Sequence, residues 1–403
     1  MRLLALLVLA PVTLLAQVRA IAPVSAPPAT GPYSPGVFVG DYLYVSAQGP
    51  SKPASTFDEQ VREALDNVKT IVEAAGLSMD HVVYTQVFLE DMARFEDMNR
   101  VYGTFFPRVP PARATIGVAK LSTPPIAVSA VAVRDASHKT AINPPGYRPD
   151  EPVSAGMLTA DRLFVSGIPG RPLGGGTVPD DPRRQTVLAL DGLKAVLDAA
   201  GLSLAHLVFV NPYLTAAVPM GVMNDEYARR FEFGNTPARA TIEVASLPRG
   251  ARIEFTGVAV RDLAQRRAVR PKNMAPSPTA SPCVFAGDTL YCSAKSGFIP
   301  GVNGGIFAAT VEHQLRQTMR NLLDNLEEAG LDFNSVVSTN VYLDALGDWP
   351  KLDSVYAKYF RGVLPARTTV QQVPSRSREP NADGAYPTQE QISLIAVRNS
   401  AAR

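Results

Sequence analysis

Apolar and polar positions in residues 37–75 follow two different periods. Residues 37–39 and 42–45 are almost all apolar or aromatic and flank Gly40-Asp41, which predicts a β-hairpin. Apolar side chains then recur every three or four positions from Val61 to Ala75, which predicts an amphipathic helix. Thr56 and Glu59 have the spacing of a capping box at its start.

The pattern changes again after this helix. Stretches rich in β-branched and aromatic residues predict three further strands, and a shorter helix separates the first of them from the other two: residues 82–89, helix 95–106, 114–118 and 127–133. The predicted order is ββαβαββ, an α/β (α+β) unit with helices on one face of a sheet.

The same pattern occurs three times along the chain. Pro-Ala-Arg stands at residues 111–113, 237–239 and 365–367, and Ala-Gly-Leu at 75–77, 200–202 and 329–331. Each copy also closes with an apolar run followed by arginine, at Arg134, Arg261 and Arg398. Markers that share one long period indicate tandem domains. We place domain 1 at residues 25–135, domain 2 at 149–262 and domain 3 at 275–399, with polar linkers between them.

Residues 1–20 differ from the rest of the chain. Arg2 precedes an apolar run from Leu3 to Ala16, and Val18-Arg19-Ala20 fits a small-residue cleavage site. This pattern is typical of a secretory signal peptide, and the run is short for a membrane anchor. We therefore expect a periplasmic or secreted protein without stable membrane contact once the signal is removed.

Charge and residue types narrow the chemistry. The formal net charge is +2, so bulk charge gives no reason to expect nucleic acid as a partner, and we interpret the basic segment 263–274 as a solvated connector. The four histidines are scattered, and no metal-ligand spacing is present. We expect neither a metal nor a cofactor.

The chain has two cysteines, Cys283 and Cys292. A two-residue turn at Gly287-Asp288 places them opposite each other on neighbouring strands. Because an exported protein meets oxidants, we expect a disulfide; two reduced core cysteines are the alternative.

Four segments of the first copy carry a family resemblance. Gly-Pro-Tyr-Ser at 31–34, Tyr-Val-Ser-Ala-Gln at 44–48, Val-Phe-Leu-Glu-Asp at 87–91 and Pro-Ala-Arg at 111–113 resemble the RidA (YjgF) family, formerly called endoribonuclease L-PSP. The resemblance implies a chorismate-mutase-like fold and trimers with ligand clefts between subunits. Three copies in one chain then imply a monomeric pseudo-trimer with a central barrel.

The resemblance also implies an activity, the hydrolysis of small enamine or imine carboxylates to keto acids and ammonia. The family arginine that binds the substrate carboxylate corresponds to Arg113, Arg239 and Arg367. A guanidinium offers a planar fork of donors that suits a carboxylate. Tyr33 matches the family tyrosine, and Val153 and Ala280 replace it in the other copies. We therefore expect one family-like cleft, with Arg113 and Tyr33 as catalytic residues; the sequence leaves open which domain supplies the tyrosine and which the arginine to each cleft.

Further substrate-binding positions follow from the same motifs. In the first copy they are Ser46, Ala47, Asn99 and Thr115. In the second copy they are Ser166, Gly167, Asn224, Arg239 and Thr241. In the third copy they are Arg367 and Thr369.

One family residue is expected to be missing. In the family, a glutamate on the last strand positions the attacking water, and we align Ser129, Thr256 and Ser393 with it. Glu254 lies two residues before Thr256 on the same strand face and is a possible substitute in the second copy. A periplasmic small-carboxylate binding protein without turnover is therefore the alternative to a deaminase, and an endoribonuclease is a weaker one. The third copy, with an extra loop near Ser375–Thr388, is expected to be the least enzyme-like.

Overall fold

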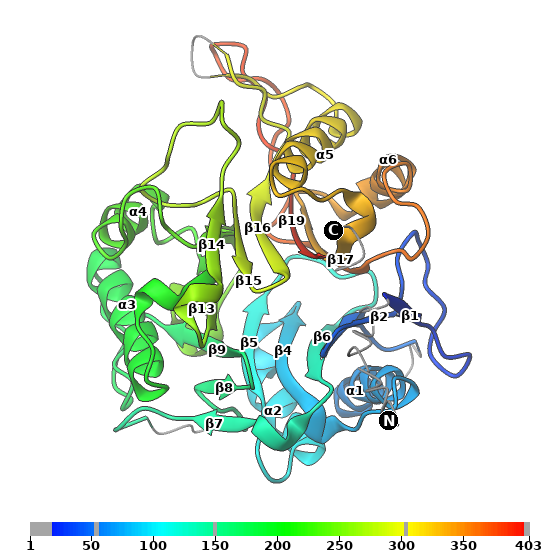
Figure 1. The fold of residues 1–403 in the computed structure, drawn as a ribbon, viewed down its shortest axis with the longest axis vertical. Coiled ribbons are helices and arrows are strands. Elements are labelled where there is room, and N and C mark those ends of the chain that lie inside the picture. Colours follow the sequence, from blue (N-terminus) through cyan, green and yellow to red (C-terminus); the bar gives the residue numbers. More distant parts are fainter. Residues whose placement is uncertain (1–17, 52–55, 148–150, 302–304, 399–403) are drawn as a thin grey trace, which may run out of the picture.

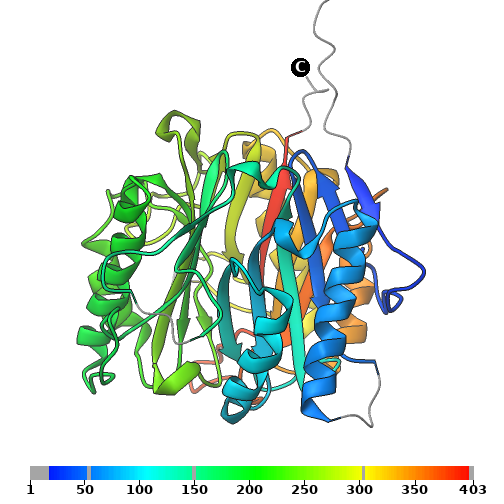
Figure 2. The same ribbon diagram turned by 90° about the horizontal axis from the view of Figure 1, so that it is seen from below.

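Three α/β domains surround a common centre in the computed structural model (Figure 1), which describes residues 18–51, 56–147, 151–301 and 305–398. The predicted signal peptide lies outside the described residues except for Val18, Arg19 and Ala20. Each domain is one mixed sheet with two helices, and Figure 2 shows the helices at the periphery with the strands inside. No helix among the described residues is both long and apolar enough to span a bilayer.

Domain 1 has the predicted elements and one more strand at its edge. Its strands are β1 Arg19–Ile21, β2 Gly36–Val39, β3 Tyr42–Gln48, β4 Val82–Leu89, β5 Ala112–Gly117 and β6 Ile126–Val133, and its helices are α1 Phe57–Ala74 and α2 Phe95–Phe105. The sheet order is β1-β2-β3-β6-β4-β5, antiparallel except for the parallel pair β4 and β5. The predicted capping box of α1 is present, with Thr56 and Glu59 bonded reciprocally.

Domains 2 and 3 repeat this order. Domain 2 contains β7 Thr140–Ile142, β8 Gly156–Leu158, β9 Arg162–Pro169, α3 Pro182–Ala199, β10 Leu207–Leu214, α4 Met220–Ala228, β11 Ala238–Arg239, β12 Ile242–Glu243 and β13 Ile253–Val260. Domain 3 contains β14 Arg266–Val269, β15 Cys283–Ala286, β16 Thr289–Lys295, α5 Val311–Glu328, β17 Val336–Leu343, α6 Trp349–Tyr356, β18 Ala366–Gln371 and β19 Glu390–Val397. The extra segment 375–388 forms no helix or strand, as predicted.

The two linkers are more ordered than expected. β7 lies in the first linker and pairs with β8, and β14 lies in the second and pairs with β15. Both are edge strands, where polar and charged side chains such as Arg266 and Arg267 are tolerated. Charge therefore concealed β14 from sequence reasoning, whereas β7, Thr-Ala-Ile, is too short to show a period.

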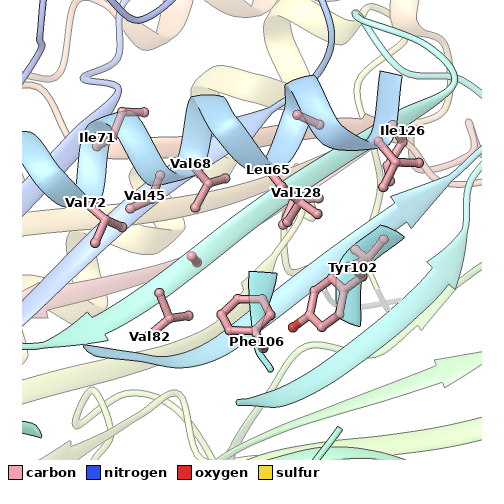
Figure 3. Close-up of a cluster of buried hydrophobic side chains, with 14 of the residues drawn as sticks. Val45, Leu65, Val68, Ile71, Val72, Val82, Tyr102, Phe106, Ile126 and Val128 are labelled. Atoms are coloured by element: carbon pink, nitrogen blue, oxygen red, sulfur yellow. The ribbon is translucent and has the colours of Figure 1, made fainter. Parts of the chain in front are cut away.

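Each domain has its own apolar core between its helices and its sheet. In domain 1, the α1 side chains Leu65, Val68, Ile71 and Val72 pack on Val45 and Val128 of the sheet (Figure 3). Burial of each such side chain contributes about 1.5–3 kcal/mol. The opposite sheet faces meet at the centre, where clusters combine residues of different domains.

The expected central barrel does not form. The three sheets stay separate, and neighbouring sheets are joined by isolated backbone bonds and serine side chains rather than by a ladder. Ser166, Ser293 and Ser46 accept hydrogen bonds from the N–H groups of Arg113, Arg239 and Arg367, each at 2.8 Å. Each serine lies where the strand register shifts, so a hydroxyl takes the place of a ladder carbonyl.

A buried arginine lies where the three hairpins meet. Arg162 is 4% exposed and pairs with Asp161 at 2.6 Å. It also donates to the hydroxyl of Tyr291 at 2.8 Å and lies 4.2 Å from the ring centroid of Tyr42. Tyr42 and Thr289 hold the equivalent hairpin positions in domains 1 and 3, so three different residues share the centre.

Cys283 and Cys292 form a disulfide between β15 and β16, in the register that the hairpin predicts.

Candidate active site

Three interdomain junctions each combine the arginine of one domain with the serine of the next. Arg113 of domain 1 meets Ser166 of domain 2, which we call the 1–2 junction. Arg239 and Ser293 define the 2–3 junction, and Arg367 and Ser46 define the 3–1 junction.

This arrangement corrects the expected grouping of Arg113 with Tyr33, Ser46 and Ala47. Tyr33 lies in the 3–1 junction, with its ring centroid 4.9 Å from the guanidinium of Arg367. The reason is the sheet order, because β3 and β5 of one domain are separated by β6 and β4. The arginine strand therefore faces the next domain rather than its own hairpin.

Arg113 is the central residue of a pocket at the 1–2 junction. Its side chain is 1% exposed, and its Nη2 donates to Asn99 Oδ1 at 2.7 Å and to Glu151 Oε2 at 2.6 Å. The guanidinium lies 4.6 Å from the ring centroid of Tyr102. The pocket is lined by residues of both domains and of the segment between them: Arg113, Thr115, Tyr147, Glu151, Val153, Ser166, Gly167, Pro169, Arg171, Pro248, Arg249 and Glu254.

Glu254 of β13, the possible substitute for the missing family glutamate, lines this pocket. Glu254 is 4% exposed. Burial raises its pKa to about 8, the nearby Glu151 carboxylate adds to the rise, and Arg113 and Arg171 oppose it. Thr256, which we had aligned with the glutamate, instead lines a cavity between the three sheets together with Ser129, and Ser393 is buried. Two residues along a strand correspond to about 7 Å, enough to separate the cavity from the junction.

Gly167 makes room for Glu254. A Cβ atom at position 167 would lie 1.9 Å from Glu254 Oε1. Domains 1 and 3 have Ala47 and Ala294 at the position of Gly167. At the position of Glu254 they have Ala127 and Gln391. Among the three copies, only domain 2 therefore combines the glycine with the glutamate.

Three buried polar atoms in the 1–2 pocket have no hydrogen-bond partner among the residues that the structure describes. They are Arg113 Nη1, Thr115 Oγ1 and Glu254 Oε1. Buried polar groups are nearly always hydrogen-bonded, because an unpartnered one costs about 1–3 kcal/mol. Their presence in one pocket indicates a place for a small polar ligand that both accepts and donates hydrogen bonds.

The 3–1 junction has the family tyrosine but differs in charge. Asp353 stands where the other domains have Asn99 and Asn224, and it lies 2.7 Å from Arg367. The rings of Tyr33, Trp349 and Tyr356 surround the guanidinium at 4.9–5.1 Å. Asp353 thus compensates the charge of Arg367, but Nε, Nη1 and Nη2 of Arg367 form no hydrogen bond with the described residues. Ala127 supplies no acid at this junction.

The 2–3 junction has Ala280 and Gln391 at the positions of Tyr33 and Glu254, and the ring of Tyr227 lies 5.0 Å from the Arg239 guanidinium. Arg239 donates to Asn224 Oδ1 at 2.8 Å, and no carboxylate partner is present in the described part of the chain. Burial lowers the pKa of Arg239. The hydroxyl oxygens of Thr241 here and of Thr369 in the 3–1 junction are buried and, like that of Thr115, find no partner within the described ranges.

Sequence reasoning missed Glu151 and Tyr147 as pocket residues. Glu151 holds the position of Gly31 in the first copy, so aligning the copies would have drawn attention to it. Tyr147 lies in the linker and had no counterpart to reveal it. Within the described ranges, no group of three or more His, Cys, Asp or Glu side chains could hold a metal ion.

Comparison with known proteins agrees with the triplication. The family description Endoribonuclease L-PSP matches residues 23–133, 147–261 and 272–375. A RutC family protein of Saccharolobus solfataricus is 43% identical over 102 residues, which are 24% of this chain and 81% of that protein. The 2-iminobutanoate/2-iminopropanoate deaminase of Escherichia coli K12 is 40% identical over 125 residues, 29% of this chain and 98% of the enzyme.

A solved chorismatase resembles most of the chain in fold. The likeness covers 79% of this chain and 93% of the chorismatase, with a TM-score of 0.51 and 13% identity. It supports the arrangement of the domains, whereas family membership rests on the three matched segments. The chain belongs to the RidA/YjgF/L-PSP family and contains three copies of the family domain in tandem.

Proposed function

We propose that the protein hydrolyses a small imine or enamine to a carbonyl compound and ammonia in the 1–2 pocket. The observation that carries the proposal is the convergence of Arg113, Thr115 and Glu254, each with an unpartnered buried polar atom. The name of the Escherichia coli relative, a deaminase of 2-iminobutanoate and 2-iminopropanoate, supports this reaction class. Those 2-imino acids are the first substrates to assay.

Glu254 is suited to move the protons of this reaction. Its raised pKa keeps the carboxyl protonated at neutral pH, so it can donate a proton to the imine nitrogen. Water then attacks the more electrophilic carbon, forming a C–O bond, and its released proton returns to the carboxylate. The carbinolamine collapses as its hydroxyl proton passes to the amine, the C–N bond breaks and ammonia leaves.

Arg113 and Thr115 are suited to hold the substrate. Both residues lie on β5, two positions apart and therefore on the same strand face. Ser166 fixes this strand by accepting a hydrogen bond from the Arg113 backbone and donating one to the Ser154 carbonyl. The substrate would thus be oriented by domain 1 and protonated by domain 2.

A trapping assay tests the proposal. An amino-acid oxidase generates 2-iminopropanoate, semicarbazide traps what remains, and hydrolysis by the protein lowers the yield of semicarbazone. We expect Glu254→Gln to reduce kcat/KM about 10²–10⁴-fold. The wild-type rate should also fall as pH rises through about 8, because the acid form of Glu254 is lost.

Thr256→Val is the matched control, because Thr256 lies on the same strand but lines the central cavity. It should retain wild-type activity. Full activity of Glu254→Gln, or equal losses in the two variants, would overturn the assignment.

A second function, carboxylate binding without turnover, is favoured at the 2–3 junction. Arg239 is the one family arginine of the three for which the described residues supply no carboxylate partner. Calorimetry with 2-ketobutyrate should show a site that Arg239→Met removes while imine hydrolysis continues. Equal heats for wild type and variant would exclude this site.

We also propose, from residues 1–20, that the protein acts outside the cytoplasm, and that one chain is the working unit because it supplies all three junctions. Cell fractionation tests the first proposal. Light scattering tests the second against the chain mass of 43.1 kDa.

A further inference from the structure

Glu151 already occupies one side of the Arg113 guanidinium. Its carboxylate lies 2.6 Å from Nη2, and its side chain is 21% exposed, so the ion pair is largely shielded from water. Asn99 also bonds Nη2, which leaves Nη1 as the unpartnered end of the fork. A ligand therefore meets half of the donor set that a bidentate carboxylate uses.

The charge around Nη1 of Arg113 disfavours a second carboxylate. Arg113 pairs with Glu151 and Arg249 with Glu96, while Arg171 acts on Glu254, so an anionic ligand at Nη1 would lie beside the Glu151 carboxylate. Like charges at such short range repel strongly where water is partly excluded. A neutral imine meets no such repulsion, and its N–H can donate to Glu151 or Glu254.

Glu151 has no equivalent at the other junctions. The corresponding residues are Gly31 and Pro278. At the 3–1 junction a Cβ at Gly31 would lie 2.5 Å from Asp353 Oδ2, so Asp353 already fills that space. Two of the three family arginines are thus paired with a carboxylate of the chain itself: Arg113 with Glu151, and Arg367 with Asp353. The two carboxylates come from positions that are not equivalent in the repeat.

We propose that Glu151 supplies in cis the carboxylate that Arg113 pairs with, so that the 1–2 pocket selects small imines without a carboxylate group. This inference rests on the proposed hydrolysis at the same site and names its substrate class. The imine nitrogen would lie toward Glu254, and Nη1 of Arg113 and the Thr115 hydroxyl would orient the imine together with the water that attacks it. Glu151 is then a specificity-determining residue of this pocket.

Two matched imines test the selectivity. Ethanimine, generated from ethylamine by an amine oxidase, differs from 2-iminopropanoate only by the carboxylate, and both are followed by semicarbazide trapping. We expect the wild type to favour ethanimine at least tenfold in kcat/KM. Glu151→Gly, which introduces the residue found at position 31, should reverse the preference at least tenfold. Glu151→Gln retains the size without the charge and should shift in the same direction.

Glu73→Gln is the control for net charge, because Glu73 belongs to an exposed ion pair with Lys69 on α1. It should leave the preference unchanged. A wild type that favours 2-iminopropanoate, with the same preference in Glu151→Gly, would overturn the inference and leave the proposed hydrolysis intact.

A binding measurement separates the two proposals if no imine is hydrolysed. In an Arg239→Met background, calorimetry with pyruvate should detect at least tenfold tighter binding to Glu151→Gly than to the parent. Equal binding would overturn the selectivity inference. Absence of hydrolysis alone would overturn the proposed function.

Discussion

A buried glutamate in the core of domain 3 should make this domain sensitive to alkaline pH. Glu390 of β19 is fully buried and stands where domains 1 and 2 have Ile126 and Ile253. The Thr318 hydroxyl of α5 donates to it at 2.5 Å. Burial raises the pKa of Glu390 to about 8, and the Thr318 bond offsets part of the rise. The folded domain therefore keeps a proton that the unfolded chain releases near its ordinary value of 4.5.

The sign and the size follow from proton linkage. Because the pKa is higher in the folded state, this contribution to stability is complete below pH 4.5 and is lost as pH rises to about 8. At 1.36 kcal/mol per pKa unit, the loss over this window is about 5 kcal/mol. Glu390→Gln should abolish this pH dependence of the free energy of unfolding. The stability of the variant relative to the wild type should therefore increase as the pH rises.

The single tryptophan provides the assay, because Trp349 lies on α6 of domain 3. Urea unfolding followed by its fluorescence between pH 5 and 9 reports this domain even if the others unfold separately. Taking the difference between wild type and variant at each pH removes the parallel contribution of Glu254. The exposed Glu328→Gln on the same helix as Thr318 is the control and should show a flat difference. A flat difference for Glu390→Gln as well would refute the reasoning.

Three further outcomes follow from the structure. Gly167→Ala should reduce imine hydrolysis as severely as Glu254→Gln, because the added methyl needs the space of that carboxyl; unchanged kcat/KM would contradict the packing. Arg162→Met should destabilise the chain by about 1–3 kcal/mol in thermal unfolding, because it removes the donor to the buried Tyr291 hydroxyl, whereas Asp161 is 53% exposed and can be solvated. The Cys283–Cys292 disulfide closes only a short loop, with a sequence separation of 9. Its reduction should therefore lower the free energy of unfolding by no more than roughly 3 kcal/mol, as measured by urea denaturation. Two thiols titrating in the denatured, unreduced protein would show that the bond is absent.

The sequence predicted the domain elements well because local signals and burial agree. The helix of residues 57–74 has a capping box, one apolar face and a glycine stop, and the structure contains all three. The strands in the two linkers were missed because β14 carries two arginines, β7 has only three residues, and the pairing that makes them strands is not local. The sheets do not close into a barrel, because single serine contacts join the domains where a barrel would need a continuous ladder. No periodicity in the sequence reveals these contacts.

The site was harder to predict than the fold for a related reason. Arg113 and Thr115 were identified from their motif, and the structure places both in the pocket. Their partners come from another domain, so the motif could not show that Glu254 rather than Tyr33 faces Arg113. The repeated apolar ending fixed the strand face of Glu254 and Thr256 but not which of them reaches the junction: Glu254 lines the pocket, and Thr256 lines the central cavity.

The order in which the junctions can close during synthesis is set by the sequence separation of their residues. Arg113 and Ser166 are 53 positions apart, and Arg239 and Ser293 are 54, whereas Ser46 and Arg367 are 321 apart. Domains fold largely in order as the nascent chain emerges from the ribosome. The pocket with Glu254 can therefore assemble before domain 3 is synthesised. The apolar side chains of Val37 and Tyr44 in domain 1 are covered only later, when Ala366 of domain 3 packs beside them. A truncated chain that lacks domain 3 would leave these apolar side chains of domain 1 exposed. Such a chain would be prone to aggregate unless a chaperone bound it.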